Sequence, residues 1–167
     1  MTNLIHHTHE LPPLIDNESK ILILGSFPSV KSREYSFFYM HPQNRFWKVL
    51  GALFNVDAYS MNIEEKKDFI ISHHIGLYDV IEECDIKGSD DSSISNVIPT
   101  DIQKLIEGTK VKRIFCLGNK SFEYFVKYNK DLVSICTKLS SSSPANAAMN
   151  LDKLIREWSI IKDSLSE

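Results

Sequence analysis

Short apolar runs alternate with segments of helical periodicity along most of this chain. Ile21–Leu24 is wholly apolar and half β-branched, and it ends at Gly25, which predicts a buried strand. Residues 25–43 contain two prolines and many aromatic residues, so we expect a loop there. From Asn44 onward, apolar residues recur at three- and four-residue spacing, which predicts an amphipathic helix. Its apolar positions are Phe46, Trp47, Leu50, Leu53 and Phe54.

The alternation of strand and helix patterns continues to the C-terminus. Further strands are predicted at Ile75–Ile81, with Asp79 at or near the end, at Val111–Leu117 and at Leu132–Thr137. Helices are predicted after the candidate N-caps Asn62, Thr100 and Asn150, and from Asn119 or Ser121 to about Tyr128. The last helix has one apolar side, which is typical of core packing. That side consists of Leu151, Leu154, Ile155, Trp158, Ile161 and Leu165.

Strands that alternate with helices are typical of βαβ units. We therefore expect one α/β domain over residues 1–167, a three-layer αβα sandwich around a central, mostly parallel four-stranded sheet. Residues 1–10 are expected to be a loosely ordered N-terminal segment. Ligands of such folds bind at the carboxyl ends of the strands. The candidate site is therefore formed by the loops after Leu24, around Asp79, after Leu117 and after Thr137.

Composition narrows the class of protein further. Hydrophobic residues make up 43% of the 167 residues, enough for a core that needs no disulfide or structural metal. The three cysteines, Cys84, Cys116 and Cys136, form no C-x-x-C pair, which favours a reducing compartment and argues against a zinc ribbon. No apolar run is long enough to span a membrane, and the start has no secretory pattern. We expect a cytoplasmic monomer, nucleoid-associated in a prokaryote, with no cofactor and no membrane partner.

The net charge of −3 hides an uneven distribution of charged residues along the chain. Residues 57–91 carry ten acidic and three basic side chains, whereas residues 92–138 carry eight basic and four acidic ones. Much of the molecule can therefore present a mildly positive face. Nonspecific affinity for nucleic acid is expected to be modest and to fall steeply with salt.

Three short motifs carry the functional signal. A G-x-x-P turn, Gly25–Pro28, follows the first predicted strand, and the block H-P-Q-N-R-F-W, His41–Trp47, opens the next helix. A serine-rich loop, Ser141–Asn146, precedes the last helix. Together these motifs resemble the uracil-DNA glycosylase superfamily from about Leu11 to the end of the chain. The resemblance is closest to the hypoxanthine (deoxyinosine)-DNA glycosylase branch, and the chain is also similar to mismatch-specific uracil/thymine-DNA glycosylases.

The resemblance implies roles for residues of the first two motifs. Mismatch-specific relatives have a water-positioning asparagine where this chain has Phe27, which favours the hypoxanthine branch, in which Asn44 would be the catalytic residue. Backbone N–H groups of Gly25, Ser26 and Phe27 would bind the base edge, and Tyr39 would stack on the base. Asp79 would recognise a ring N–H. Ser141, a weaker donor than the histidine or asparagine of other branches, would contact the base oxygen.

The implied activity is that of a monofunctional DNA glycosylase. Such an enzyme flips a deaminated base out of DNA and hydrolyses its N-glycosidic bond, here with hypoxanthine as first choice and uracil or xanthine as secondary substrates. The partner would be damaged DNA, double- or single-stranded. No lysine is indicated as a Schiff-base nucleophile and no metal is implied. The DNA-binding residues would be His41, Ser142, Ser143, Pro144, Ala145 and Asn146.

Structural explanations compete with several of these roles. Asn44 is a good helix N-cap, and His41 before a proline is typical of a residue that fixes a loop. Tyr39 and Phe27 have the pattern of core aromatics, and Asp79 that of a cap or salt-bridge residue. The serine loop has the composition of a solvated loop, and the histidines near the N-terminus are expected to be solvated rather than metal-binding. These are His6, His7 and His9.

Two other functions compete with the glycosylase. One is a non-catalytic module that binds damaged DNA or nucleotides, favoured by Phe27 and Ser141, which stand where relatives carry stronger catalytic groups. The other is a hydrolase of free nucleosides, which would need clustered carboxylates for the sugar hydroxyls. The loop after Leu24 contains no such cluster. Release of a base from DNA, from a free nucleoside or from neither distinguishes the three.

Overall fold

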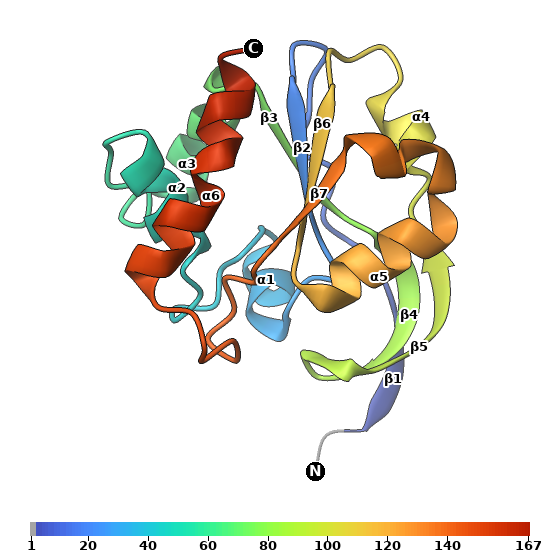
Figure 1. Ribbon diagram of the computed structural model, residues 1–167. Helices are drawn as coiled ribbons and strands as arrows, with labels where there is room; N and C mark the ends of the chain where they lie inside the picture. Colours follow the sequence, from blue (N-terminus) through green and yellow to red (C-terminus); the bar gives the residue numbers. More distant parts are fainter. Residues whose placement is uncertain (1–2) are drawn as a thin grey trace.

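A four-stranded parallel sheet forms the centre of the computed structural model, which describes residues 3–167 (Figure 1). Its strand order is β3-β2-β6-β7. The strands are β2 (Ile21–Gly25), β3 (Ile75–Asp79), β6 (Arg113–Leu117) and β7 (Cys136–Leu139). All residues of β2 and β3 are buried, as expected of parallel strands that are covered on both faces.

Helices cover both faces of this sheet, which confirms the predicted α/β class and its layered architecture. In Figure 1, α2, α3 and α6 lie on one side of the sheet and α4 and α5 on the other. The helices are α1 (Val30–Tyr35), α2 (Phe46–Leu53), α3 (Ile63–Ser72), α4 (Ile102–Ile106), α5 (Asn119–Tyr128) and α6 (Leu151–Leu165), with a 3-10 helix η1 (Lys130–Ile135) before β7. Asn62 and Asn150 cap α3 and α6 as predicted, each accepting a backbone N–H three residues on.

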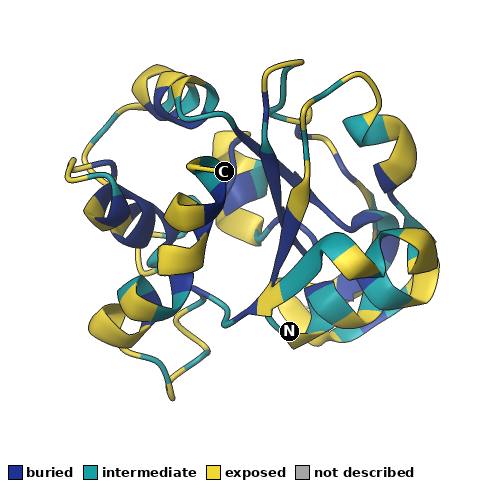
Figure 2. Ribbon diagram, turned by 45° about the horizontal axis from the view of Figure 1, so that its top comes forward, coloured by how far each residue is buried: buried dark blue, intermediate teal, exposed yellow. Residues whose placement is uncertain are grey.

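The apolar sides of the helices meet the sheet in one core. Figure 2 shows buried residues on the strands and on the inner sides of the helices, and exposed residues on the outside. Trp158 of α6 is fully buried and lies edge-on to Phe46 of α2, with ring centroids 5.8 Å apart. Leu154 and Ile161 of α6 are also buried, as their spacing predicts, whereas Leu151 is exposed.

A second, antiparallel sheet was not predicted. Its order is β1-β4-β5, from β1 (Leu4–Thr8), β4 (Ile81–Lys87) and β5 (Asp90–Pro99). The predicted strand Ile75–Ile81 is divided, because β3 ends at Asp79 and β4 begins two residues later. β4 and β5 form a hairpin whose two-residue turn, Gly88-Ser89, has Gly88 at a φ of 61°. Gly in a two-residue turn between strands is typical of a β-hairpin.

The N-terminal segment also differs from expectation. We expected residues 1–10 to be loosely ordered. Leu4–Thr8 instead pairs with β4 in antiparallel register, whereas residues 1 and 2 lie outside the described residues. β1 is an edge strand and most of its residues are exposed, so its side chains show no alternation of buried and exposed positions. A strand held mainly by backbone hydrogen bonds leaves little trace in a hydrophobic pattern.

Three local boundaries also differ from the prediction. Leu132–Thr137 was predicted as a strand, but residues up to Ile135 form η1 and the strand begins at Cys136. Helix α1 lies inside the predicted loop and is capped by Ser29. Asp101 rather than Thr100 caps α4, because its side chain accepts the N–H of Lys104.

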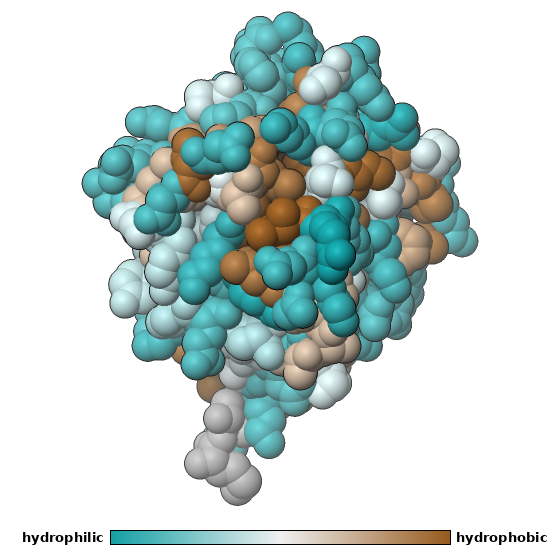
Figure 3. Space-filling model, turned by 60° about the vertical axis from the view of Figure 1, so that its left-hand side comes forward, coloured by the Kyte–Doolittle hydropathy of each residue, from teal (hydrophilic) through white to brown (hydrophobic). Residues whose placement is uncertain are grey.

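None of the described helices combines the length and apolar character needed to cross a bilayer. On the face shown in Figure 3, hydrophilic residues cover most of the surface and hydrophobic residues gather near its centre.

The order of the parallel strands places the topological switch point of the sheet between β2 and β6. The chain leaves β2 for β3 on one side and later returns to β6 on the other, so the connections diverge between β2 and β6. Ligands of open α/β sheets bind at such a point, outside the carboxyl ends of the strands. In Figure 1 this edge of the sheet lies beside α1 and the start of α5.

Candidate active site

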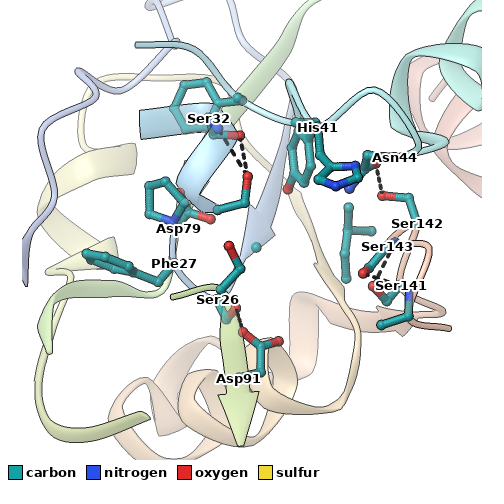
Figure 4. A pocket seen from close by; sticks show the side chains of 18 of the residues that line it. Ser26, Phe27, Ser32, His41, Asn44, Asp79, Asp91, Ser141, Ser142 and Ser143 are labelled. Atoms are coloured by element: carbon teal, nitrogen blue, oxygen red, sulfur yellow. Dashed lines mark hydrogen bonds between the residues drawn. The ribbon is translucent and has the colours of Figure 1, made fainter. Parts of the chain in front are cut away.

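A pocket of about 290 Å³ opens at the carboxyl ends of the parallel strands. Most of the sequence-predicted site residues line it, although they come from four separate parts of the chain (Figure 4). The predicted residues in the lining are Gly25, Ser26, Phe27, Tyr39, His41, Asn44, Asp79, Ser141, Ser142, Ser143, Pro144 and Ala145. The lining also includes Pro28, Ser29, Ser32, Phe38, Ser89, Asp91 and Leu117, which were not predicted as site residues. Of the predicted set, only Asn146 lies outside the lining.

Gly25 is the point where the walls of the pocket come closest together. A Cβ atom on this residue would lie 2.6 Å from Oδ1 of Asp79 and 3.0 Å from the hydroxyl of Tyr39. No side chain fits that space, so a glycine is required at the end of β2. The carbonyls of Gly25 and Ser26 accept the N–H groups of Val80 and Ile81, which fixes the backbone of the turn.

Asp79 is buried at the base of the pocket and pairs with His9. The Nε2 atom of His9 lies 2.8 Å from Oδ2 of Asp79, and the exposed fractions of the two side chains are 0% and 5%. The ring of His9 packs against Tyr78, with centroids 4.3 Å apart. The expectation that His9 is a solvated histidine is therefore wrong. His9 directly follows the edge strand β1. Its backbone N–H donates to the carbonyl of Glu82, and its side chain lies in the core.

Tyr39 combines features of a core aromatic and of a site residue. Its ring stacks on Phe46, with centroids 3.9 Å apart and planes 10° apart. Its hydroxyl is buried without a hydrogen-bond partner among the described residues, and burial raises the pKa of this phenol well above its ordinary value. The residue has a φ of 56°, and a left-handed conformation costs a non-glycine residue roughly 1–2 kcal/mol. Strain of this kind is common at functional sites.

Asn44 links the start of α2 to the serine loop. Its Oδ1 accepts the backbone N–H of Phe46 at 2.9 Å and the hydroxyl of Ser142 at 2.8 Å (Figure 4). The backbone donor fixes which atom of the amide is the oxygen, so the NH2 group is the side that remains to donate. The predicted capping role is therefore real, although Arg45 is the N-cap residue by position.

Ser142 was predicted to contact DNA, but its side chain lies inside the protein. It is 2% exposed, and its hydroxyl is engaged by Asn44. The neighbouring residue Arg45 also holds this loop. It was not predicted as a site residue. Its guanidinium donates to the carbonyls of Ser143 at 2.8 Å and Asn146 at 3.1 Å, and also to that of Met149. The two motifs therefore form one unit.

The tip of the serine loop is exposed. Pro144 and Ala145 face solvent, whereas Ser141 and Ser143 are partly buried. Ser141 accepts the N–H of Ser143, and Ser143 accepts that of Ala145, so the hydroxyls brace the turn. The side chain of Asn146 donates to the carbonyl of Ser141 at 3.0 Å. These hydrogen bonds fix the conformation of the loop, which therefore differs from a freely solvated loop.

His41 and Phe27 line opposite parts of the pocket. Nδ1 of His41 accepts the N–H of Gln43 at 3.1 Å, which supports the predicted loop-fixing role and leaves the proton of the neutral ring on Nε2. Phe27 is buried and meets the ring of His9 edge-on. Its side chain offers no polar atom to the pocket.

The tip of the β4–β5 hairpin closes one side of the pocket. Ser26 donates to Oδ1 of Asp91 at 3.0 Å, and the hydroxyl of Ser89 accepts the N–H of Val30 at 2.8 Å. Arg33 of α1 donates to the carbonyl of Gly88 at 2.8 Å. Two carboxylates, Asp79 and Asp91, therefore face the pocket, although neither of them belongs to the loop after β2. No group of three metal-binding side chains occurs in the part of the chain that the structure describes.

Comparison with known proteins agrees with the motifs. A model of the uracil DNA glycosylase superfamily matches residues 12–162, which is nearly the whole chain. The chain belongs to the uracil DNA glycosylase superfamily. The match includes the G-x-x-P turn, the block around Asn44 and the serine loop.

Similar proteins occur in two species of Methanosarcina. The chain is 33% identical over 114 residues to a hypoxanthine DNA glycosylase of Methanosarcina barkeri (strain Fusaro / DSM 804), covering 68% of this chain and 72% of that protein. A hypoxanthine DNA glycosylase of Methanosarcina acetivorans is 34% identical over 114 residues, again covering 68% of this chain and 72% of that protein. A solution NMR structure of a proposed uracil DNA glycosylase from Methanosarcina acetivorans has a TM-score of 0.79 and 30% identity, covering 94% of this chain and 97% of that one.

Membership of the superfamily establishes the general activity. The protein is a DNA glycosylase, a hydrolase that acts on the bond between base and sugar, and its substrate is DNA. Among the residues that sequence reasoning missed, Arg45 stands inside the H-P-Q-N-R-F-W block and was available from the motif. Asp91 and His9 had no such signal, because they belong to strands of the unpredicted second sheet or directly follow one.

Proposed function

We propose that this DNA glycosylase excises hypoxanthine, with uracil or xanthine as secondary substrates, in base excision repair. The observation that carries the proposal is the meeting of Asn44, Asp79 and the serine loop at one pocket of the superfamily fold. The two relatives that are named hypoxanthine DNA glycosylase support this choice of base.

Breakage of the N-glycosidic bond sets the requirements on the site. The C1′–N bond breaks with its electron pair moving to the base, which leaves an oxocarbenium-like sugar. The enzyme must flip the nucleotide, hold the base, stabilise both charges and place one water. Asn44 is our candidate for placing the water. Because its Oδ1 already accepts two hydrogen bonds, the amide NH2 group would donate to the water oxygen.

The base of the pocket suits the hydrogen-bonding edge of a deaminated base. Hypoxanthine, xanthine and uracil each present a ring N–H beside a carbonyl oxygen, whereas adenine and cytosine present the reverse pattern. A carboxylate only accepts hydrogen bonds, so Asp79 would pair with the ring N–H and not with the bare ring nitrogen of adenine. Backbone N–H groups of Gly25, Ser26 and Phe27 and the hydroxyl of Ser141 would serve the oxygen.

Tyr39 and the serine loop would hold the flipped nucleotide. Tyr39 would stack on the base, with Phe46 supporting its other ring face. Pro144 and Ala145 are exposed at the loop tip and would enter the minor groove beside the lesion, while His41, Ser143 and Asn146 would contact the backbone. Ala145 is a small wedge, which favours a base that is already weakly paired or unpaired.

We also propose that the enzyme is monofunctional. No lysine is among the described residues that line the pocket, so a Schiff base with the sugar has no donor there. Borohydride should therefore trap no covalent adduct with DNA. A trapped adduct during excision would overturn this part of the proposal.

Single-turnover excision is the decisive experiment. Labelled oligonucleotides with one central hypoxanthine, uracil or xanthine are tested in duplex and single strand, and alkali reveals abasic sites. Asn44→Ala should abolish excision. Asn62→Ala is the matched control, because it also removes a side-chain bond to a helix N-terminal N–H, at a cost of about 1 kcal/mol, but lies outside the pocket.

Each outcome assigns the function. Excision of hypoxanthine that only Asn44→Ala abolishes supports the proposal, and preferential excision of uracil changes the base. A folded Asn44→Ala protein with the wild-type rate would refute the proposed mechanism. Salt-sensitive binding to damaged DNA without release of any base would indicate a non-catalytic module, and release from free inosine would indicate a nucleoside hydrolase.

A further inference from the structure

The amide of Asn44 can place a water only if its NH2 group faces the pocket. The oxygen and nitrogen ends of an amide have nearly the same shape, so hydrogen-bond partners decide where each end points. Two donors meet Oδ1 of Asn44. One is the backbone N–H of Phe46 at 2.9 Å, and the other is the hydroxyl of Ser142 at 2.8 Å. The second donor lies 98 residues further along the chain, so it is a contact that only the fold supplies.

The hydroxyl of Ser142 is directed at this amide and not at solvent. Its side chain lies inside the protein, although the residue belongs to the lining of the pocket. In Figure 4 the hydroxyl points at Asn44, and the dashed line joins the two side chains. A hydroxyl that is covered and bonded in this way is not free to contact a DNA phosphate. Its one described hydrogen bond is the bond to Asn44.

The backbone of Ser142 is fixed by separate contacts. Its carbonyl accepts the backbone N–H of Arg45 at 3.1 Å and the Nε–H of the same residue at 3.4 Å. Ser140, two residues earlier, is bonded to Glu157 and Trp158 of α6. The hydroxyl is therefore held at a fixed place relative to Asn44, and such preorganisation costs no rearrangement during the reaction.

We propose that Ser142 is a positioning residue of the glycosylase reaction, an inference that rests on the proposed function. One hydrogen bond leaves the plane of the Asn44 amide free to pivot about its oxygen. A second bond from another direction fixes that plane, and with it the direction in which the NH2 group donates. A hydrogen bond accepted at the oxygen also polarises the amide, which strengthens the NH2 group as a donor to the water.

Three roles of Ser142 differ in the step that they change. A positioning residue changes the rate of bond cleavage but neither the affinity for DNA nor base flipping. A DNA contact changes the affinity. A residue that only braces the loop changes flipping, because the loop tip would enter the duplex beside the lesion. Flipping is followed by the fluorescence of 2-aminopurine placed next to the damaged base, which rises when stacking is lost.

Ser142→Ala removes the hydroxyl, and Ser142→Thr keeps it. Ser142→Cys, which has nearly the same size and a much weaker donor, carries the same test if Ser142→Ala does not fold. Ser121→Ala is the matched control. Ser121 is as buried as Ser142 and its hydroxyl also donates one bond, to the carbonyl of Leu24 at 2.9 Å, but it does not line the pocket. Urea unfolding establishes that each variant is folded.

We expect Ser142→Ala to lose roughly 10- to 100-fold in the single-turnover rate of excision, which is the effect of a small misplacement at a reacting centre. Its affinity for damaged DNA and its 2-aminopurine signal should match those of the wild type. Ser142→Thr should recover most of the rate, and Ser121→Ala should keep the wild-type rate. All variants are measured on the base that the wild type excises fastest.

Other results would overturn the assignment. A folded Ser142→Ala protein with the wild-type rate would do so, and so would a loss of affinity or of flipping that accounts for the slower excision. The proposed function fails differently, through a wild type that releases no base or an Asn44→Ala variant that keeps the wild-type rate. An inactive Asn44→Ala beside a fully active Ser142→Ala would refute the positioning role alone.

Discussion

Replacement of Arg45 by lysine should loosen the serine loop and slow excision together. The guanidinium donates to four backbone carbonyls that lie about a hundred positions away in the sequence, those of Ser142, Ser143, Asn146 and Met149. Lysine keeps the positive charge but has one ammonium group instead of a planar fork of donors. It cannot bond all four carbonyls at once, so the loop loses part of its tie to the start of α2, while the bond from Ser142 to Asn44 remains.

The size of the effect follows from the number of bonds. A hydrogen bond with a charged donor contributes roughly 1.5–3 kcal/mol, and four of them set an upper bound of about 6–12 kcal/mol. Lysine retains one bond and water reaches the loop carbonyls, so we expect a loss of about 3 kcal/mol. In a chain of this length that lowers Tm by roughly 6–12 °C.

Three measurements check this prediction. Calorimetry gives the Tm, hydrogen exchange of residues 140–150 reports the opening of the loop, and single-turnover excision reports the alignment of Ser142 with Asn44. Arg113→Lys is the control, because Arg113 makes only an exposed contact with Glu167, 3.6 Å apart. If Arg45→Lys kept the Tm, the loop protection and the excision rate of the wild type, the loop would be held by other contacts and the reasoning would fail.

Three further predictions concern other parts of the site and core. Gly25→Ala should lose excision and roughly 1–3 kcal/mol of stability, measured by urea unfolding, because its Cβ would lie 2.6 Å from Asp79; wild-type values would contradict the geometry. His9→Phe keeps the packing but leaves the buried Asp79 without its donor, so the urea midpoint should indicate a loss of about 3 kcal/mol. Cys136 should react first with iodoacetamide, because a hydrogen bond with the Cys116 thiol lowers the pKa of Cys136, whereas burial raises the pKa of Cys84 to about 11. Mass spectrometry of the labelled peptides shows which cysteine reacts first.

The central sheet was predictable because each strand carries its own signal. Ile21–Leu24 is buried on both faces, so its apolar run alone indicates a strand of a covered sheet. Asn62 forms a complete capping box with Glu65, which fixes the start of α3 locally. Strand β7 is short and has only one buried residue, Leu139, so the apolar residues of η1 just before it were mistaken for the strand.

The site was predictable where a motif carries it. Asn44 and Ser142 belong to motifs far apart in sequence, and the structure joins them through one hydrogen bond of 2.8 Å. His9 and Asp91 depend instead on the pairing of β1 and β5 with β4, which is a long-range property of the fold. A histidine near the end of a chain and an aspartate in a polar run look solvated until that pairing is known.

The acidic segment 57–91 takes on a different meaning once its last residues are placed. Read as charge alone, ten acidic side chains argue against binding of nucleic acid. The fold places two of them, Asp79 and Asp91, in the lining of the pocket, where Asp79 would pair with a ring N–H of the base. Carboxylates oppose the attraction of phosphate and stabilise positive charge, so we expect these two to weaken ground-state binding and to favour a transition state with positive charge on the sugar. The modest affinity for DNA that we expect would then be a consequence of the chemistry, because only stabilisation that grows toward the transition state raises the rate.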